Sequence, residues 1–279
     1  MATAEPTRTW QSAEAAEIWR RGAARRAHTL AVATQRMLDA VGLSRGMHVL
    51  DVAAGTGDQS VLAANIVGPT GSVLATDISA TMLAEAEKAS HEAGLHNVHT
   101  SVQDASALKV AEGHFDAAIC RFGLMFVPDL HQALSRVHLA LKPGARFAAL
   151  VWSTEERNPW IGVQLATIRE MGRMPSPPPP IVRTTSLSAP GTLEHAFGEA
   201  GFRDMRTEAA PTPREFESHD EANTAMWTTS PNQAELLRDL SEAERARYRT
   251  EVERRLAAYV QLDGRCVVPG EALLGVGTA

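Results

Sequence analysis

Short apolar runs alternate with stretches of helical periodicity along the first part of this chain. The runs are rich in valine, leucine and alanine, and most of them end at a polar residue or a turn. Between them, apolar side chains recur every three or four positions, as in helices that pack on a sheet. The pattern predicts strands at about 47–52, 72–77, 96–103, 115–121 and 145–152. Strands that alternate with helices predict a parallel sheet with right-handed crossovers.

The predicted helices have recognisable starts and ends. Ser79 is a good N-cap for one of them, Pro128 and Asp129 open another, and Gly42 and Gly94 end two more. The strand at 96–103 is less apolar than the others, which places it nearer an edge of the sheet. The predicted helices cover 11–24, 26–41, 58–67, 79–93, 128–141, 160–172 and 192–200.

The pattern becomes less regular after Trp152. The proline-rich run at 174–180 cannot continue a helix, and a rigid surface connector is favoured over a site for a proline-binding partner. A sixth strand is predicted at 202–210 and a last one at about 266–278, with two or three helices at 218–263 between them. We divide the chain into an N-terminal helical cap, an α/β core and a helical lid insertion, at residues 1–45, 46–217 with 264–279, and 218–263.

A glycine turn follows the first strand, and acidic residues end three strands. Asp51 precedes Gly55 and Gly57, and a helix begins near position 58; Asp77 and Asp104 follow the next two strands. Glycines let a ligand approach the backbone, and a carboxylate at the end of the second strand can accept both hydroxyl hydrogens of a ribose. Burial in an ordinary sheet explains the valines and leucines but not these acids. The pattern therefore predicts a pocket for a nucleoside-containing cofactor.

Five segments over residues 45–152 resemble, in order, the motifs of class I S-adenosylmethionine-dependent methyltransferases, with the ubiquinone/menaquinone-biosynthesis-like branch the most similar. They are Asp51-x-x-x-Gly55-x-Gly57 and the runs at 73–77, 102–105, 115–122 and 141–147. The resemblance implies a doubly wound, Rossmann-like sheet of seven strands, the last antiparallel and placed between the fifth and sixth. It also implies S-adenosyl-L-methionine as cofactor and S-adenosyl-L-homocysteine as product.

The resemblance also assigns roles to residues. Gly55 and Gly57 would admit the methionine part of the cofactor, Asp51 would favour its ammonium group, and Asp77 would hold the ribose. Ile78 and Met82 would pack on the adenine, although plain core packing is an equally good reading of Met82. The full cofactor set is Asp51, Ala53, Gly55, Gly57, Asp77, Ile78, Met82, Asp104, Ala105, Cys120 and Arg121.

Methyl transfer from a sulfonium needs mainly alignment and exclusion of water. Arg121 and His131 are the candidate catalytic residues. Arg121 either holds an anionic substrate or forms a structural ion pair, and a solvent-facing histidine is the more ordinary reading of His131. Aromatic side chains could line an apolar cavity for a small acceptor. The candidates for substrate contact are Trp19, Phe122, Met125, Trp152 and Trp227, whereas simple helix packing is an equally good reading of Trp160 and Trp227.

The amino-acid composition restricts the kinds of partner that we expect this protein to bind. The net charge of −6 argues against nucleic acid, and the pairs Arg20-Arg21 and Arg25-Arg26 read as solvated helix faces beside Glu14 and Glu17. Two cysteines fit a reducing cytoplasm, and Cys120 reads as a small buried apolar residue. We expect neither a signal peptide, nor a membrane span, nor a metal site. We therefore expect the partner to be a small-molecule substrate. The sequence does not decide whether the protein forms a homodimer.

Two other functions compete with a methyltransferase. A protein of the same fold could bind S-adenosylmethionine as a structural ligand or use it in a non-methyl reaction. An NAD(P)-dependent oxidoreductase is disfavoured, because Ser60 stands where the dinucleotide fingerprint has its third glycine. Neither tyrosine, Tyr248 or Tyr259, belongs to a Tyr-x-x-x-Lys pair. Identification of the ligand that stays bound after purification would distinguish these functions: S-adenosylhomocysteine would support a methyltransferase, and NAD(P) would reject it.

Overall fold

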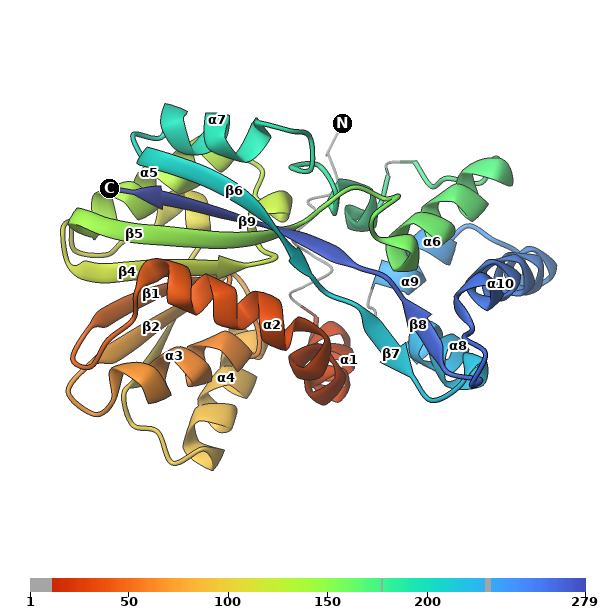
Figure 1. The fold of residues 1–279 in the computed structure, drawn as a ribbon, viewed down its shortest axis with the longest axis horizontal. Helices are drawn as coiled ribbons and strands as arrows, with labels where there is room; N and C mark the ends of the chain where they lie inside the picture. Colours follow the sequence, from red (N-terminus) through yellow and green to blue (C-terminus); the bar gives the residue numbers. More distant parts are fainter. Residues whose placement is uncertain (1–11, 177, 229–231) are drawn as a thin grey trace.

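The computed structural model describes residues 12–176, 178–228 and 232–279. A seven-stranded sheet has the order β3-β2-β1-β4-β5-β9-β6, and β9 runs antiparallel to both of its neighbours (Figure 1). The parallel sheet, the edge position of β3 and the place of the antiparallel strand are confirmed. The strands are β1 (His48–Val52), β2 (Ser72–Asp77), β3 (Val98–Val102), β4 (Phe115–Arg121), β5 (Leu141–Trp152), β6 (Arg203–Pro211) and β9 (Glu271–Thr278).

Helices cover both faces of the sheet (Figure 1). One face packs against α2 (Ala23–Val41), α3 (Asp58–Val67) and α4 (Ala80–Glu92). The other packs against α5 (Leu130–Ala140) and α7 (Thr192–Glu199). Because the central strands are covered on both sides, they read as continuous apolar runs. The caps predicted at Ser79 and Asp129 are present, since each side chain accepts a hydrogen bond from a backbone N–H three residues on.

The last predicted strand divides into two. β8 (Cys266–Val268) leaves the main sheet and pairs with β7 (Arg214–Phe216), and β9 begins only at Glu271. Pro269 offers no backbone donor, and the Gly270 carbonyl accepts from the Thr212 amide at the point where the β6–β9 pairing ends and the β7–β8 pairing begins. The single strand expected at 266–278 is therefore wrong, and the β7–β8 ribbon is an addition that the pattern did not predict.

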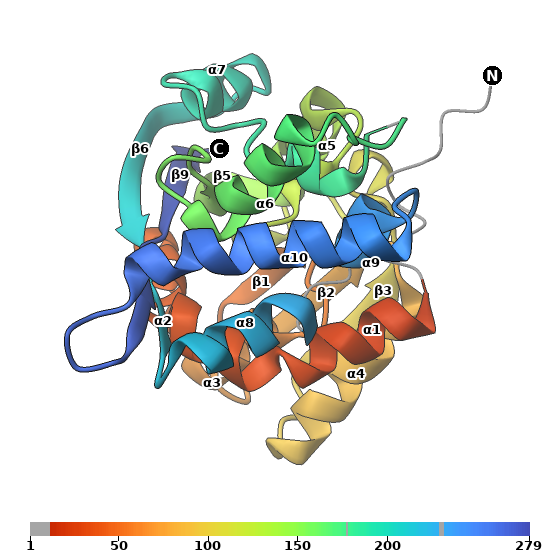
Figure 2. The ribbon, with the colours of Figure 1, turned by 90° about the vertical axis from the view of Figure 1, so that its right-hand side faces the viewer.

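Further helices and the β7–β8 ribbon lie beyond the end of the main sheet (Figures 1 and 2), and they enclose a second apolar core. It includes Leu165, Phe216, Tyr248 and Val252, so the helices predicted within 218–263 share one core with α6 and the ribbon. Its longest helix carries a capping box between Ser241 and Glu244. The helices of this part are α6 (Pro159–Glu170), α8 (His219–Thr228), α9 (Asn232–Leu237) and α10 (Glu242–Leu256).

The two N-terminal helices, α1 (Ala13–Arg21) and α2, occupy two different places in the fold. The second half of α2 lies on the sheet, where Met37 and Leu38 are buried in the core shared with β4, β5 and β9. Only α1 and the first turns of α2 lie over the strand ends, with α8 beside them in Figure 2. The cap predicted for residues 1–45 is thus partly a sheet-covering helix; its residues 1–11 lie outside the described part of the chain.

None of the helices described is long and apolar enough to cross a membrane. Within the described ranges, no group of three histidine, cysteine or acidic side chains is arranged to hold a metal ion.

Candidate functional site

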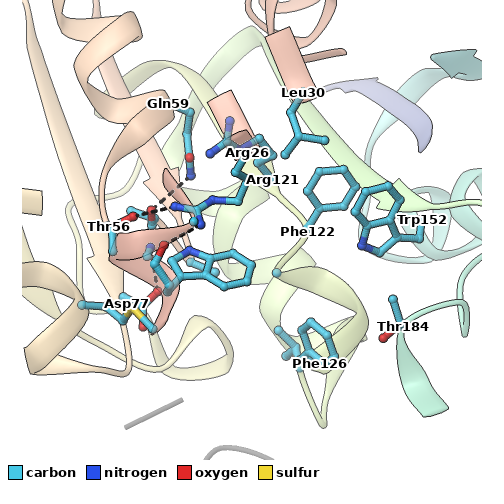
Figure 3. Close-up of a pocket in the computed structure, with 18 of the residues that line it drawn as sticks. Arg26, Leu30, Thr56, Gln59, Asp77, Arg121, Phe122, Phe126, Trp152 and Thr184 are labelled. Atoms are coloured by element: carbon cyan, nitrogen blue, oxygen red, sulfur yellow. Dashed lines mark hydrogen bonds between the residues drawn. The ribbon is translucent and has the colours of Figure 1, made fainter. Parts of the chain in front are cut away.

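A cavity of about 290 Å³ opens at the carboxyl ends of β1, β2, β4 and β5. The glycine turn after β1 and the acidic residues after β2 and β3 form one side of it. Helix α6, Ile181, Thr184 and the β7–β8 ribbon form the other, and the first turns of α2 extend from one side to the other. Figure 3 shows the two halves, with the charged groups Arg26, Arg121 and Asp77 on one side and the rings of Phe122, Trp152 and Phe126 on the other. This is the edge of an open α/β sheet at which ligands bind.

Asp77 holds the glycine turn in place. Its Oδ2 atom accepts a hydrogen bond of 2.9 Å from the Gly55 amide, and its Oδ1 atom accepts one of 2.9 Å from the Ser79 amide. Burial raises the pKa of this carboxyl, and the backbone donors oppose that rise. Each carboxylate oxygen can accept a further hydrogen bond, so Asp77 can still bind a hydroxyl group in the cavity.

Asp51 lies beneath the turn and does not line the cavity. Its oxygens accept hydrogen bonds from the Ser60 hydroxyl and from Gln59 Nε2, which also donates to the Ala54 carbonyl. Burial raises the pKa of Asp51 to about 7, although both donors lower it. A direct contact with a cofactor ammonium group is therefore not available to this side chain, and any attraction acts through the turn.

We expect the stability of the protein to depend on pH through Asp51. The pKa of Asp51 is about 7 in the folded protein and 3.8 as its ordinary value. Between these two pH values the Asp51 carboxyl is therefore protonated in the folded state and ionised in the unfolded state. The stabilisation is complete below pH about 4 and is lost as the pH rises through about 7, by up to about 1.4 kcal/mol per pH unit. Urea unfolding at pH 5, 6.5 and 8 should show wild type losing stability relative to Asp51→Asn. Parallel profiles for the two proteins would contradict this assignment.

Two arginines share one carboxylate beside the turn. Nη2 of Arg26 and Nη2 of Arg121 each lie 3.0 Å from Asp58 Oδ2, and Arg121 also donates to Thr34 Oγ1 at 3.0 Å. Burial opposes ionisation of Asp58, but the two guanidinium charges hold its pKa below the ordinary value. The structural ion pair considered for Arg121 is present, and the same residue lines the cavity. One carboxylate for two cations leaves this cluster of three side chains with a net positive charge.

The prediction of a solvated face at Arg25-Arg26 is wrong for Arg26. Its guanidinium lies 4.2 Å from the centre of the Trp19 ring, donates to the Trp19 carbonyl at 2.7 Å, and is largely buried. The helical pattern could not reveal this, because Asp58 and Trp19 come to Arg26 from different elements. Arg20 and Arg21 do pair with Glu17 on an exposed face.

The ends of β2 and β3 supply the rest of this half. Ile78, Met82, Gln103, Asp104 and Ala105 line the cavity. Asp104 Oδ1 accepts hydrogen bonds from the amide and the hydroxyl of Ser106, at 2.8 and 2.7 Å, and so caps the short turn that begins at Ala105. The side chain is exposed and presents a carboxylate beside an apolar wall.

Strained backbone joins the two halves of the cavity. Ala53 has φ of 55° and Phe122 has φ of 60°, a region that costs L residues roughly 1–2 kcal/mol. Between them there is no room for a side chain at Gly123, where a Cβ would lie 2.4 Å from that of Ala53. The unusual dihedral of Phe122 accompanies a stacked contact with Trp152, with ring centres 4.2 Å apart. Such strain is typical of functional sites.

Several predicted site residues do not line the cavity. His131 is exposed on α5, and Met125 is fully buried in the core against that helix. Trp227 packs against Tyr248 within the second core and donates to Glu253 Oε1 at 3.2 Å. The roles predicted for these three are therefore not supported by their positions. Cys120 and Gly57 also lie outside the lining, and burial raises the pKa of the Cys120 thiol to about 12.

The structure adds residues that sequence reasoning missed. Trp19, Phe122 and Trp152 line the cavity as predicted, and Trp160 joins them. None of the described residues within 218–263 lines it, so α6 and the ribbon take the place expected of that insertion. The periodicity of α2 and α6 could have indicated inward faces, but no sequence signal points to Arg214. The missed lining residues include Arg25, Arg26, Thr29, Leu30, Thr56, Gln59, Phe126, Ile161, Gln164, Ile181, Thr184 and Arg214.

Residues 27–163 match the ubiE/COQ5 methyltransferase family. A ubiquinone/menaquinone biosynthesis C-methyltransferase UbiE from Pseudoalteromonas translucida is 38% identical over 116 residues, which are 41% of this chain and 46% of that protein. A demethylmenaquinone methyltransferase from Listeria welshimeri is 38% identical over 108 residues, 39% of this chain and 46% of the relative. The chain thus spans about half the length of the curated relatives that it matches.

The fold is similar to that in the crystal structure of YcgJ from Bacillus subtilis. That chain superposes with a TM-score of 0.57 at 18% identity, covering 88% of this chain and 97% of YcgJ. At this identity the likeness shows the fold.

Proposed function

We propose that this chain, whose residues 27–163 match the ubiE/COQ5 methyltransferase family, is a class I S-adenosylmethionine-dependent methyltransferase that methylates a small-molecule acceptor. One observation carries the proposal: the glycine turn, Asp77 and Asp104 meet at one cavity that continues into an aromatic half. The first half fits a nucleoside with a charged amino-acid tail, and the second fits the acceptor.

The donor set of this half fits S-adenosylmethionine. Asp77 would accept from the ribose hydroxyls, Asp104 from the adenine amine, and Ile78 and Met82 would cover the adenine face. Arg26 lies beside the glycine turn, and one N–H of its Nη1 remains after its hydrogen bonds to Trp19, Thr56 and Asp58, so it could donate to the carboxylate of the cofactor. The bound cofactor would supply an activated methyl group on sulfur. The residues of this chain would hold the acceptor in line with that group and exclude water from it.

The lining of the cavity restricts the acceptor. Among the described residues that line it there is no histidine, cysteine, tyrosine, lysine or glutamate, and both aspartates belong to the cofactor half. The acceptor must then lose its proton readily, because no obvious general base faces it. We propose a phenol or an activated carbon acid, carried on an apolar body that fits between Leu30, Phe126 and Trp152.

Calorimetry tests the proposal. S-adenosylmethionine and S-adenosylhomocysteine should bind to the protein, whereas NADH should not. Incubation of the protein with S-adenosylmethionine and a set of phenolic and quinol acceptors should then release S-adenosylhomocysteine. Preferential binding of NADH would overturn the proposal. Binding of S-adenosylhomocysteine without turnover of any acceptor would favour a protein that uses the cofactor otherwise.

We propose that α1, α6 and the β7–β8 ribbon form the cover of the site. Trp19, Trp160 and Ile181 come from segments outside the parallel sheet and line the cavity, and an ion pair of 2.5 Å between Arg25 and Glu221 joins α2 to α8. Closure of a cover removes water from the reacting groups. S-adenosylhomocysteine should therefore slow hydrogen exchange in α1 and α6 as well as at Gly55. Protection confined to the glycine turn would show that these helices are scaffold.

We also propose a cytoplasmic enzyme that acts on small molecules and not on nucleic acid. The net charge of −6 and the two cysteines, both buried and free, support this assignment.

A further inference from the structure

Arg214 is a charged side chain that forms no ion pair with any acidic residue in the described part of the chain. It stands on β7 and faces the aromatic half of the cavity. Its Nη1 atom is buried without a hydrogen-bond partner, and within the described residues no acidic side chain forms an ion pair with it. Burial alone lowers its pKa to about 10, so the residue remains charged at neutral pH.

Two tryptophans hold the guanidinium. Its central carbon lies 5.2 Å from the ring centre of Trp152 and 5.2 Å from that of Trp160. The stack continues on both sides, since Phe122 lies on Trp152 and Phe216 lies on Trp160, with ring centres 4.2 and 5.3 Å apart. Contacts of this kind attract the cation through its faces and leave the N–H donors at its edge available.

The other arginines of the cavity are already paired. Arg26 and Arg121 share Asp58, and Arg25 binds Glu221. A buried charge without a partner costs free energy, and a donor that lacks an acceptor adds to that cost. Arg214 therefore differs from Arg25, Arg26 and Arg121, because its charge can be neutralised by a ligand in the cavity.

We propose that Arg214 binds a carboxylate carried by the methyl acceptor, with the apolar body of the acceptor lying in the aromatic half. This inference rests on the proposed function, because it names the acceptor class of that same site. The planar guanidinium edge matches a carboxylate with two parallel hydrogen bonds, which a hydroxyl or amide cannot provide.

The carboxylate is a group other than the one that receives the methyl. If the oxygen bound to Arg214 were methylated, its charge would disappear as the new bond formed, and the contact would weaken in the transition state. Interactions that weaken along the reaction oppose catalysis. A spectator carboxylate keeps its charge throughout, so Arg214 serves as a specificity-determining residue and not as a reacting one.

The test compares naphthalene-2-carboxylate with naphthalene-2-carboxamide, which has the same shape without the charge. Isothermal titration of wild type, with and without saturating S-adenosylhomocysteine, should show at least about tenfold tighter binding of the carboxylate. Arg214→Gln should remove this preference and leave the affinity for the carboxamide unchanged. Arg206→Gln, on the exposed face of β6, should behave as wild type.

The two proposals fail in different ways. Equal affinities of wild type for the two probes would overturn the carboxylate site, as would a preference that survives in Arg214→Gln. Failure of wild type to bind S-adenosylhomocysteine would instead overturn the proposed function, whatever the probes show. If Arg214→Gln does not fold, Arg214→Lys decides the question: it keeps the charge but not the fork, so it should still prefer the carboxylate, by a smaller factor than wild type, and an unchanged preference would overturn the site.

Discussion

Replacement of Asp77 by alanine should weaken binding of S-adenosylhomocysteine by at least about tenfold. The variant loses the acceptor proposed for the ribose, and a hydrogen bond to a charged group contributes roughly 1.5–3 kcal/mol. It also loses the acceptor for the Gly55 and Ser79 amides, so the glycine turn itself loses support. Titration calorimetry measures the first effect, and urea unfolding should show a loss of about 1–3 kcal/mol for the second.

Asp129→Ala is the matched control for this variant. Asp129 also accepts a hydrogen bond from a backbone amide at a helix start, that of Gln132, but it does not line the cavity. Its loss should cost stability without changing the affinity for S-adenosylhomocysteine. If Asp77→Ala binds this ligand like wild type and circular dichroism shows an intact fold, another group holds the ribose.

Gly57→Ala should lower the free energy of unfolding by about 2–5 kcal/mol. Gly57 has φ of 80°, and a Cβ there would lie 2.7 Å from the Cβ of Ala86 and 3.0 Å from its Cα. The obstacle is the backbone of α4, which cannot rotate away as a flexible side chain could. The substitution must push α3 and α4 apart, and urea unfolding measures the cost.

Gly94→Ala separates the backbone effect from the steric one. Gly94 has φ of 70°, but a Cβ there would meet nothing within 4 Å. It should cost only the left-handed conformation, roughly 1–2 kcal/mol. Equal losses in the two variants would mean that the close approach of α3 and α4 relaxes without penalty.

The sequence by itself determined the sheet and the cofactor half of the site. Strand periodicity, the turn at Gly55 and the acids at Asp77 and Asp104 depend on residues close together along the chain. The carboxyl ends of parallel strands meet at one edge, so locating the strands also located these groups. The structure brings Ile78, Met82 and Ala105 to the same cavity.

Only the tertiary structure decided the acceptor half. Trp227 and Trp160 look alike in sequence, yet one belongs to a closed core and the other lines the cavity. The sequence pattern predicted a solvated Arg26, whereas the structure packs Asp58 and Trp19 against it. No sequence signal distinguished Arg214, which in the structure lies between Trp152 and Trp160. The reason is physical: local pattern sets which face of an element is apolar, whereas the neighbours of a side chain are set by how distant segments pack.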